Sequence, residues 1–205
     1  MKKIIIGIII AFIFWFILFS PLTKNFVNFW VGMILATGIL TIYTIILDKK
    51  HIMQLLKTEI KWIYIGIFSA IILYFIFFVG YFFSTQIFSF ASKQVDNIYS
   101  IKNQSDKLLI SIALFFWIGP AEEIFWRGLV QGKLSYKYGQ TRGFIFTTLL
   151  YAIIHIWSFN FLLFMAALIC GIFWGWMFKK YNSLVPIIIS HSLWDVLIFV
   201  VIPIT

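Results

Sequence analysis

Apolar runs long enough to cross a lipid bilayer recur along the whole chain of 205 residues. The composition agrees, because 62% of the residues are hydrophobic and only 11% are charged. The hydrocarbon region offers no water to the backbone, so such a chain must pair its N–H and C=O groups within helices of roughly 20 residues. The sequence therefore predicts an all-α, polytopic transmembrane helical bundle in the cell membrane, surrounded by the lipid bilayer.

Seven apolar segments account for these runs, and only the polar stretch 85–107 forms a long connection, which we expect to be a solvated outer loop. The segments are 4–20, 26–47, 62–84, 108–131, 143–158, 160–178 and 183–203. Cytoplasmic loops are usually rich in Lys and Arg. With the N-terminus inside, the inner connections hold eleven such residues and the outer ones four. We therefore predict about seven spans, with the N-terminus in and the C-terminus out.

The first segment follows Met1, Lys2 and Lys3 and so has the basic start of a signal peptide. Its apolar part is longer than most signal-peptide cores, and residues 20–23 lack a small-x-small cleavage pattern. We expect this segment to be retained as the first helix. A tight turn is predicted at 158–160, between the fifth and sixth segments.

The formal net charge of +9 does not indicate a nucleic-acid partner, because the basic residues are scattered among short loops and form no continuous stripe. Cys170 is the only cysteine, which excludes an intramolecular disulfide and a thiolate metal cluster. It lies in an apolar run and is expected to be a packing residue.

Three polar groups on three different segments fall at one predicted depth. A charged side chain at mid-membrane depth costs roughly 2.5–3.5 kcal/mol, so such groups usually serve a function. With a rise of about 1.5 Å per residue, Glu122 lies roughly 15 Å from the inner end of its segment, His155 roughly 18 Å and His191 roughly 12 Å. This common level predicts one buried site.

Glu122 and Glu123 are neighbours on a helix and point about 100° apart, so they cannot face the same point. Glu123 precedes Arg127 by four residues, the favoured spacing for an acid-base pair. We assign Glu123 and Arg127 a structural, orienting role and leave Glu122 for the site. Gly119 and Pro120 precede the pair, and the proline predicts a kink or break with a cavity beside it.

His191 and Asp195 share one helix face because they are four residues apart. A carboxylate with two imidazoles, here Glu122, His155 and His191, can bind a divalent metal such as zinc and leave a position for water. Alternatively, Glu122 can activate water directly as a general base while a histidine polarises the carbonyl. Both routes lead to peptide hydrolysis.

These residues resemble the three motifs of the CPBP intramembrane proteases, a family that includes the CAAX prenyl endopeptidases and bacteriocin-processing proteins. The motifs here are Glu-Glu-x-x-x-Arg at 122–127, aromatic-x-x-x-His at 151–155 and His-x-x-x-Asp at 191–195. Pro120 and Gly128 also agree with the family pattern. The resemblance covers about residues 108–200, and the order of the motifs across successive spans makes it fairly specific.

The resemblance implies a membrane endopeptidase in which Glu122 and His155 activate water, His191 completes the site and Asp195 stabilises the oxyanion. Asp195 stands where asparagine is common in the family, and a carboxyl group can donate to an oxyanion only when it is protonated. Tyr151 replaces the usual phenylalanine. On this basis residues 1–105 form N-terminal membrane helices with the outer loop, and 106–205 form a CPBP-like catalytic helical core within one integrated bundle.

The expected substrate is a peptide or a membrane protein: a prenylated-type C-terminus, a leader peptide or a membrane-spanning segment. Two alternatives belong to other classes. One is an inactive membrane scaffold or immunity protein, against which the presence of both glutamates, the arginine and both histidines argues. The other is a small proton-coupled transporter, which the absence of an inverted repeat disfavours.

Overall fold

The computed structural model describes residues 1–23 and 26–204, and over these ranges the chain is almost entirely helical, with no strand. Three long apolar helices come first, and the second is irregular at Asp48, where φ is −153° and ψ is 43°. The Asn28 side chain caps that helix by accepting hydrogen bonds from the backbone N–H groups of Trp30 and Val31. The helices are α1 (Lys2–Phe19), α2 (Phe29–Leu55) and α3 (Ile60–Ile87).

The stretch 85–107, predicted to be a solvated loop, instead contains a helix, so this prediction was wrong. Helix α4 (Ala91–Tyr99) continues into the 3-10 helix η1 (Ser100–Gln104). The Gln94 carbonyl accepts a hydrogen bond from the Asn160 side chain at 2.8 Å, and the Gln94 side chain accepts one from Leu162 N at 3.0 Å. These bonds tie α4 to the start of helix α9 (Phe161–Tyr181).

A single helical rod runs from Lys107 to Tyr138. A kink or break was predicted at Pro120, and the structure shows a π-helical turn there instead of a break. The Gly119 N–H donates to the carbonyl of Leu114, five residues back, which makes the preceding turn a π-helix. The wider turn accommodates the proline without ending the rod. Its parts are α5 (Lys107–Ala113), η2 (Leu114–Ile118), α6 (Gly119–Glu123), η3 (Ile124–Gln131) and α7 (Gly132–Tyr138), of which η2 and η3 are π-helical.

The remaining elements form a helical hairpin and a C-terminal helix. Phe159 adopts a left-handed conformation with φ of 49°, and the Asn160 side chain caps the following helix by accepting from Leu163 N at 2.9 Å. The predicted tight turn at 158–160 is therefore confirmed. The elements are α8 (Gln140–Ile153), the 3-10 helix η4 (Ile154–Ser158), α9 (Phe161–Tyr181), α10 (Val185–Val196) and the π-helical η5 (Leu197–Val201).

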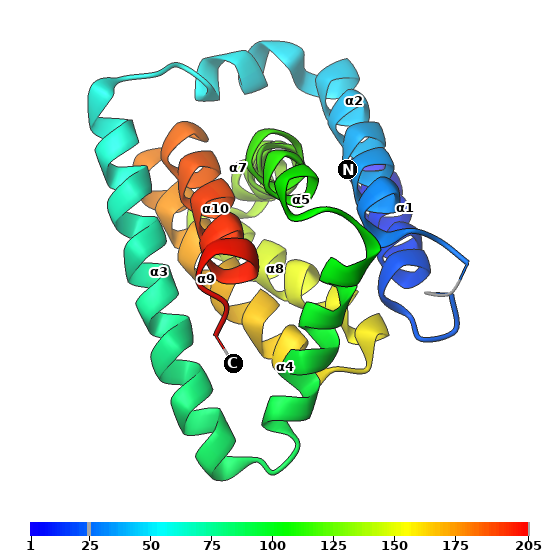
Figure 1. The fold of residues 1–205 in the computed structure, drawn as a ribbon. Helices are drawn as coiled ribbons and strands as arrows, with labels where there is room; N and C mark the ends of the chain where they lie inside the picture. The colour runs from blue at the N-terminus through cyan, green and yellow to red at the C-terminus, as the bar shows by residue number, and fades with distance from the viewer. Residues whose placement is uncertain (24–25, 205) are drawn as a thin grey trace.

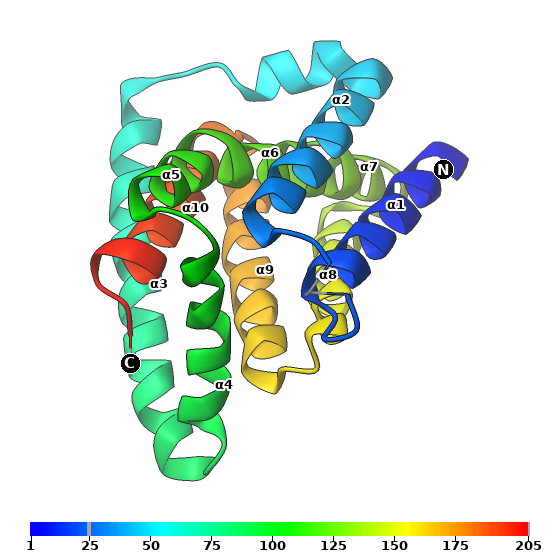
Figure 2. The same cartoon turned by 45° about the vertical axis from the view of Figure 1, so that its right-hand side comes forward.

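The central rod lies between the other helices. Figure 1 shows α3 along one side of the molecule and α1 and α2 along the other, with α5 and α10 between them. The rod contacts α2, α8, α9 and α10, while α3 packs along α10 and α1 packs on η4. Figure 2 shows α5, α6 and α7 as one rod that crosses the bundle. This rod carries both adjacent glutamates into the middle of the structure.

The outer surface of the bundle is apolar, as a membrane protein requires. On α3, large hydrophobic side chains such as Phe68, Phe75 and Phe82 are exposed. Among the described residues, five helical stretches are long and apolar enough to span a membrane, and 185–201 is a shorter apolar helix. The five are Lys2–Phe19, Phe29–Leu55, Ile60–Ile87, Lys107–Tyr138 and Phe161–Tyr181. The helical membrane bundle is confirmed, whereas seven spans, the orientation and the division at 105 stay predictions.

Candidate active site

All four residues predicted to carry catalysis line one cavity of about 480 Å³. Glu122 comes from α6, His155 from η4, and His191 and Asp195 from α10. Glu122, His155 and His191 are buried, as a site within the bundle requires. Apolar side chains from several other helices make up most of the remaining wall, among them Phe29, Met33, Phe77, Phe88, Phe161 and Ile169. The structure thus gathers the polar groups at an otherwise apolar cavity.

Glu123 lies at the centre of a buried charge network. Its side chain and that of Arg127 are 0% and 1% exposed, and Arg127 Nε lies 3.3 Å from Glu123 Oε2. This geometry agrees with the predicted pair at i, i+4. The other oxygen, Oε1, lies 2.7 Å from His191 Nδ1, a contact that the sequence did not indicate. Glu123 therefore links the central rod to α10.

His191 lies between two carboxylates. Its Nδ1 contacts Glu123, and its Nε2 lies 3.4 Å from Asp195 Oδ2, the partner predicted from their spacing on one helix face. Trp174 stacks on the imidazole with ring centroids 3.8 Å apart and an interplanar angle of 21°. These contacts hold the ring at both edges and on one face. The longer contact, between His191 and Asp195, lies in the wall of the cavity.

Glu122 accepts a hydrogen bond from the Tyr151 hydroxyl, with 3.1 Å between Tyr151 Oη and Glu122 Oε2. The guanidinium of Arg127 lies over the Tyr151 ring, with its Cζ atom 4.7 Å from the ring centroid. Sequence reasoning treated Tyr151 as an aromatic substitution and missed this hydroxyl contact. The hydroxyl that tyrosine has and phenylalanine lacks could have indicated this contact, because a buried tyrosine O–H normally has a hydrogen-bond partner.

His155 has both ring nitrogens engaged. Nδ1 lies 2.8 Å from the carbonyl oxygen of Tyr151, which can only accept, so Nδ1 carries a proton. Nε2 accepts a hydrogen bond from the indole N–H of Trp15 at 3.1 Å, which fixes the neutral tautomer. Trp15 belongs to α1 and is fully buried. No feature of the sequence pointed to this partner, 140 positions away.

The predicted metal ligands Glu122, His155 and His191 do not form a metal-binding group in this arrangement. Within 1–23 and 26–204, no cluster of three or more His, Cys, Asp or Glu side chains is placed to hold an ion. A histidine ligand needs a free ring nitrogen aimed at the metal. The acceptor nitrogen of His155 is taken by Trp15, so this imidazole offers no free nitrogen to an ion. This donor set does not fit a metal ion.

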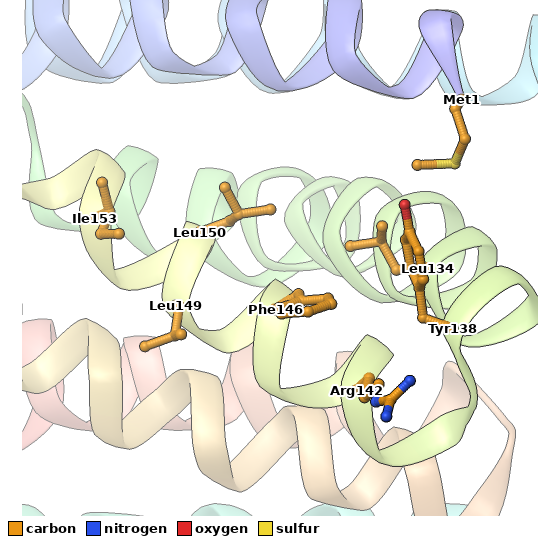
Figure 3. Close-up of a pocket in the computed structure, with 8 residues that line it drawn as sticks. All are labelled: Met1, Leu134, Tyr138, Arg142, Phe146, Leu149, Leu150 and Ile153. Atoms are coloured by element: carbon orange, nitrogen blue, oxygen red, sulfur yellow. The ribbon is translucent and has the colours of Figure 1, made fainter.

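A second hollow, of about 610 Å³, lies beside α7 and α8 near the start of the chain (Figure 3). Its wall is mainly apolar, and Arg142 is the only charged side chain among the lining residues. Carboxylates and imidazoles are missing from this wall, so the hollow offers no general base. The candidate active site is therefore the cavity at Glu122.

Fold and site together define a polytopic helical membrane protein with a buried carboxylate–imidazole centre, a class suited to hydrolysis within the membrane. Residues 104–197 match the family model described as type II CAAX prenyl endopeptidase Rce1-like. This segment, which carries all three motifs, is similar to that family, so the resemblance to the CPBP and CAAX proteases is confirmed. No curated protein and no solved structure gave a match. The family supports a membrane endopeptidase in general.

Proposed function

We propose that the chain is an intramembrane endopeptidase of the cell membrane that uses Glu122 as the general base. The observation that carries the proposal is the convergence of Glu122, His155, His191 and Asp195 on one cavity, within the segment that matches the family. Buried ionisable groups at membrane depth are costly, and a cavity gathers them where a substrate can reach them.

The proposed reaction begins when Glu122 takes a proton from a water molecule in the cavity. The water oxygen bonds to the carbonyl carbon of the scissile peptide, and the carbonyl electron pair moves onto its oxygen. The oxyanion then collapses, the C–N bond breaks, and Glu122 returns the proton to the leaving amine. No step passes through a metal ion, because the donor set described above does not fit one.

The contact between His191 and Asp195 is suited to stabilising the oxyanion. Its separation of 3.4 Å is long for a hydrogen bond, so a proton held between the two groups can turn to a developing negative charge. Glu123 keeps the opposite nitrogen of His191 fixed at 2.7 Å. The Tyr151 hydroxyl holds the base in place, and His155 contacts the backbone carbonyl of the same residue.

We propose a peptide or membrane-protein substrate with an apolar segment close to the scissile bond. The cavity wall beyond the polar groups is lined mainly by aromatic and aliphatic side chains, which suits such a segment. A prenylated-type C-terminus, a leader peptide and a membrane-spanning segment all meet this description. The similarity to type II CAAX prenyl endopeptidases makes the first of these the natural first substrate to assay.

The test is cleavage of quenched fluorescent peptides by purified protein in detergent, with one prenylated CAAX C-terminus, its unprenylated form and one apolar leader sequence. We expect turnover to fall at least about 100-fold in Glu122→Gln, the usual effect of removing a general base. Glu59→Gln, at an exposed position, is the matched control and should keep full activity.

Chelator treatment with metal re-addition is the second arm. Activity that survives chelation supports direct activation of water by Glu122. Activity that is lost on chelation and restored by one metal would show that a metal ion takes part in activating the water. Cleavage of equal rate in wild type and Glu122→Gln would remove Glu122 from the reaction. A folded protein that cleaves none of the peptides would favour a membrane scaffold.

A further inference from the structure

We infer that Trp15, on the first helix, is a positioning residue of the active site. The inference rests on the proposed function above. The matched family segment begins at residue 104, so α1 lies wholly outside it. Nevertheless, α1 packs directly on η4, the short 3-10 helix that carries His155.

A chain of directed hydrogen bonds connects Trp15 to the proposed base. The Trp15 indole donates to His155 Nε2 at 3.1 Å, and His155 Nδ1 donates to the backbone carbonyl of Tyr151 at 2.8 Å. The Tyr151 hydroxyl then donates to Glu122 Oε2 at 3.1 Å. The middle bond ends on the backbone carbonyl of Tyr151, so the three residues are linked through the Tyr151 backbone. Trp15 fixes the His155 ring, and the Tyr151 hydroxyl holds Glu122.

Trp15 itself does not reach the cavity. It is fully buried and is not among the residues that line the cavity, whereas His155, Tyr151 and Glu122 all line it. Trp15 therefore acts through His155 and cannot contact a substrate there. Together with the Tyr151 carbonyl, its indole N–H favours one tautomer of His155 and restrains the ring from turning about its χ2 angle.

The surroundings of His155 explain why a hydrogen bond is needed to hold the ring. Aromatic rings surround the imidazole: Phe19 lies at 5.3 Å, Tyr151 at 5.2 Å and Trp15 at 6.0 Å between centroids. Packing of this kind fits either ring flip of a histidine almost equally well. Two hydrogen bonds distinguish the flips: the Tyr151 carbonyl requires a donor nitrogen on its side, and the indole N–H of Trp15 requires an acceptor nitrogen on the other.

The same helix–helix contact contains a matched control residue. Trp157 lies on η4 and packs against Phe12 and Phe16 of α1, with ring centroids 5.2 and 5.0 Å apart. Its indole N–H has no hydrogen-bond partner among the described residues, and Trp157 does not line the cavity. Trp157→Phe therefore removes the same side-chain atoms as Trp15→Phe at the contact between α1 and η4, but it removes no hydrogen bond.

The experiment compares Trp15→Phe, Trp157→Phe and wild type on the quenched peptide that wild type cleaves fastest. We expect kcat to fall roughly 2- to 12-fold in Trp15→Phe, the effect of one net hydrogen bond, with KM unchanged. Trp157→Phe should keep wild-type kcat and KM. A purely structural role for Trp15 would lower the active fraction of Trp15→Phe and leave the kcat of its folded fraction unchanged.

Nitrogen NMR of histidine-labelled protein gives a readout that does not need a substrate, since the chain has only three histidines. The Nε2 signal of His155 should shift in Trp15→Phe and not in Trp157→Phe. Equal kcat in the two variants, or an unshifted His155 signal, would overturn the inference while leaving Glu122 as the base. Full activity of Glu122→Gln would instead overturn the proposed function.

Discussion

Removing Arg127 tests whether the charge of Glu123 is truly buried and compensated. We expect Arg127→Met to lower the free energy of unfolding by at least about 3 kcal/mol. Breaking a buried ion pair from one side typically costs about 3–5 kcal/mol, because an unpaired charge remains. Glu123 is 0% exposed and would keep only its contact to His191. Loss of the guanidinium over the Tyr151 ring adds about 0.5–2 kcal/mol.

The assay is denaturation with sodium dodecyl sulfate in mixed micelles, followed by tryptophan fluorescence, for which the chain has nine tryptophans. Lys61→Met is the matched control, because the Lys61–Glu59 pair is exposed. Exposed ion pairs contribute about 0–1 kcal/mol, so this variant should remain close to wild type. A loss in Arg127→Met no larger than in Lys61→Met would refute the reasoning.

A double variant separates the charge from the packing. Glu123→Gln combined with Arg127→Met removes both charges together and leaves an amide that can still contact His191. Because no unpaired charge remains, the double variant should be more stable than Arg127→Met alone. If it is less stable by the sum of the two single losses, Glu123 and Arg127 do not interact.

Two further predictions concern the scaffold around the site. A Cβ added at Gly143 would lie 2.6 Å from the Cα atom of Ser135, so Gly143→Ala should lower the free energy of unfolding by about 1–3 kcal/mol, measured by the same denaturation. Gly80→Ala is its control, since a Cβ there meets open space, and equal losses would contradict the close approach. Asn160→Ala removes both the cap on Leu163 N and the hydrogen bond to the Gln94 carbonyl and should cost about 1–3 kcal/mol, whereas Asn160→Ser should retain part of the cap. Equal stability of all three forms would argue against these contacts.

The sequence was sufficient for features that depend on local spacing. The period of the helix separated Glu122 from Glu123, paired Glu123 with Arg127 and placed His191 on the same face as Asp195, and the structure agrees on all three. Apolar composition and length indicated the membrane bundle. These properties are set by neighbours in the chain, so no tertiary information was required.

Features that depend on how the helices dock could not be predicted in the same way. Helix α4 is short, and its polar composition resembles that of a loop until Val95 and Ile98 are seen at the cavity. The contact of Trp15 with His155 joins residues 140 positions apart, and several other tryptophans in the chain had equal claim to a role. The Tyr151 hydroxyl could be recognised as needing a partner, but its partner depended on the packing of α8 against the rod.

The rotation of α6 within the rod decides which of the two adjacent glutamates faces the site. Neighbouring residues differ by about 100°, and the polar partners of Glu122 and Glu123 lie on different helices: α8 for the first and α10 for the second. The π-helical turn that ends with the bond from Gly119 N–H to the Leu114 carbonyl takes up one more residue than an α-helical turn. It therefore rotates everything that follows by about one residue position relative to an uninterrupted α-helix. Proline at 120 favours this turn because it cannot supply the α-helical donor. Pro120, which predicts a kink or break from sequence alone, thus helps to set the angle at which the rod presents Glu122 to the cavity and Glu123 to His191.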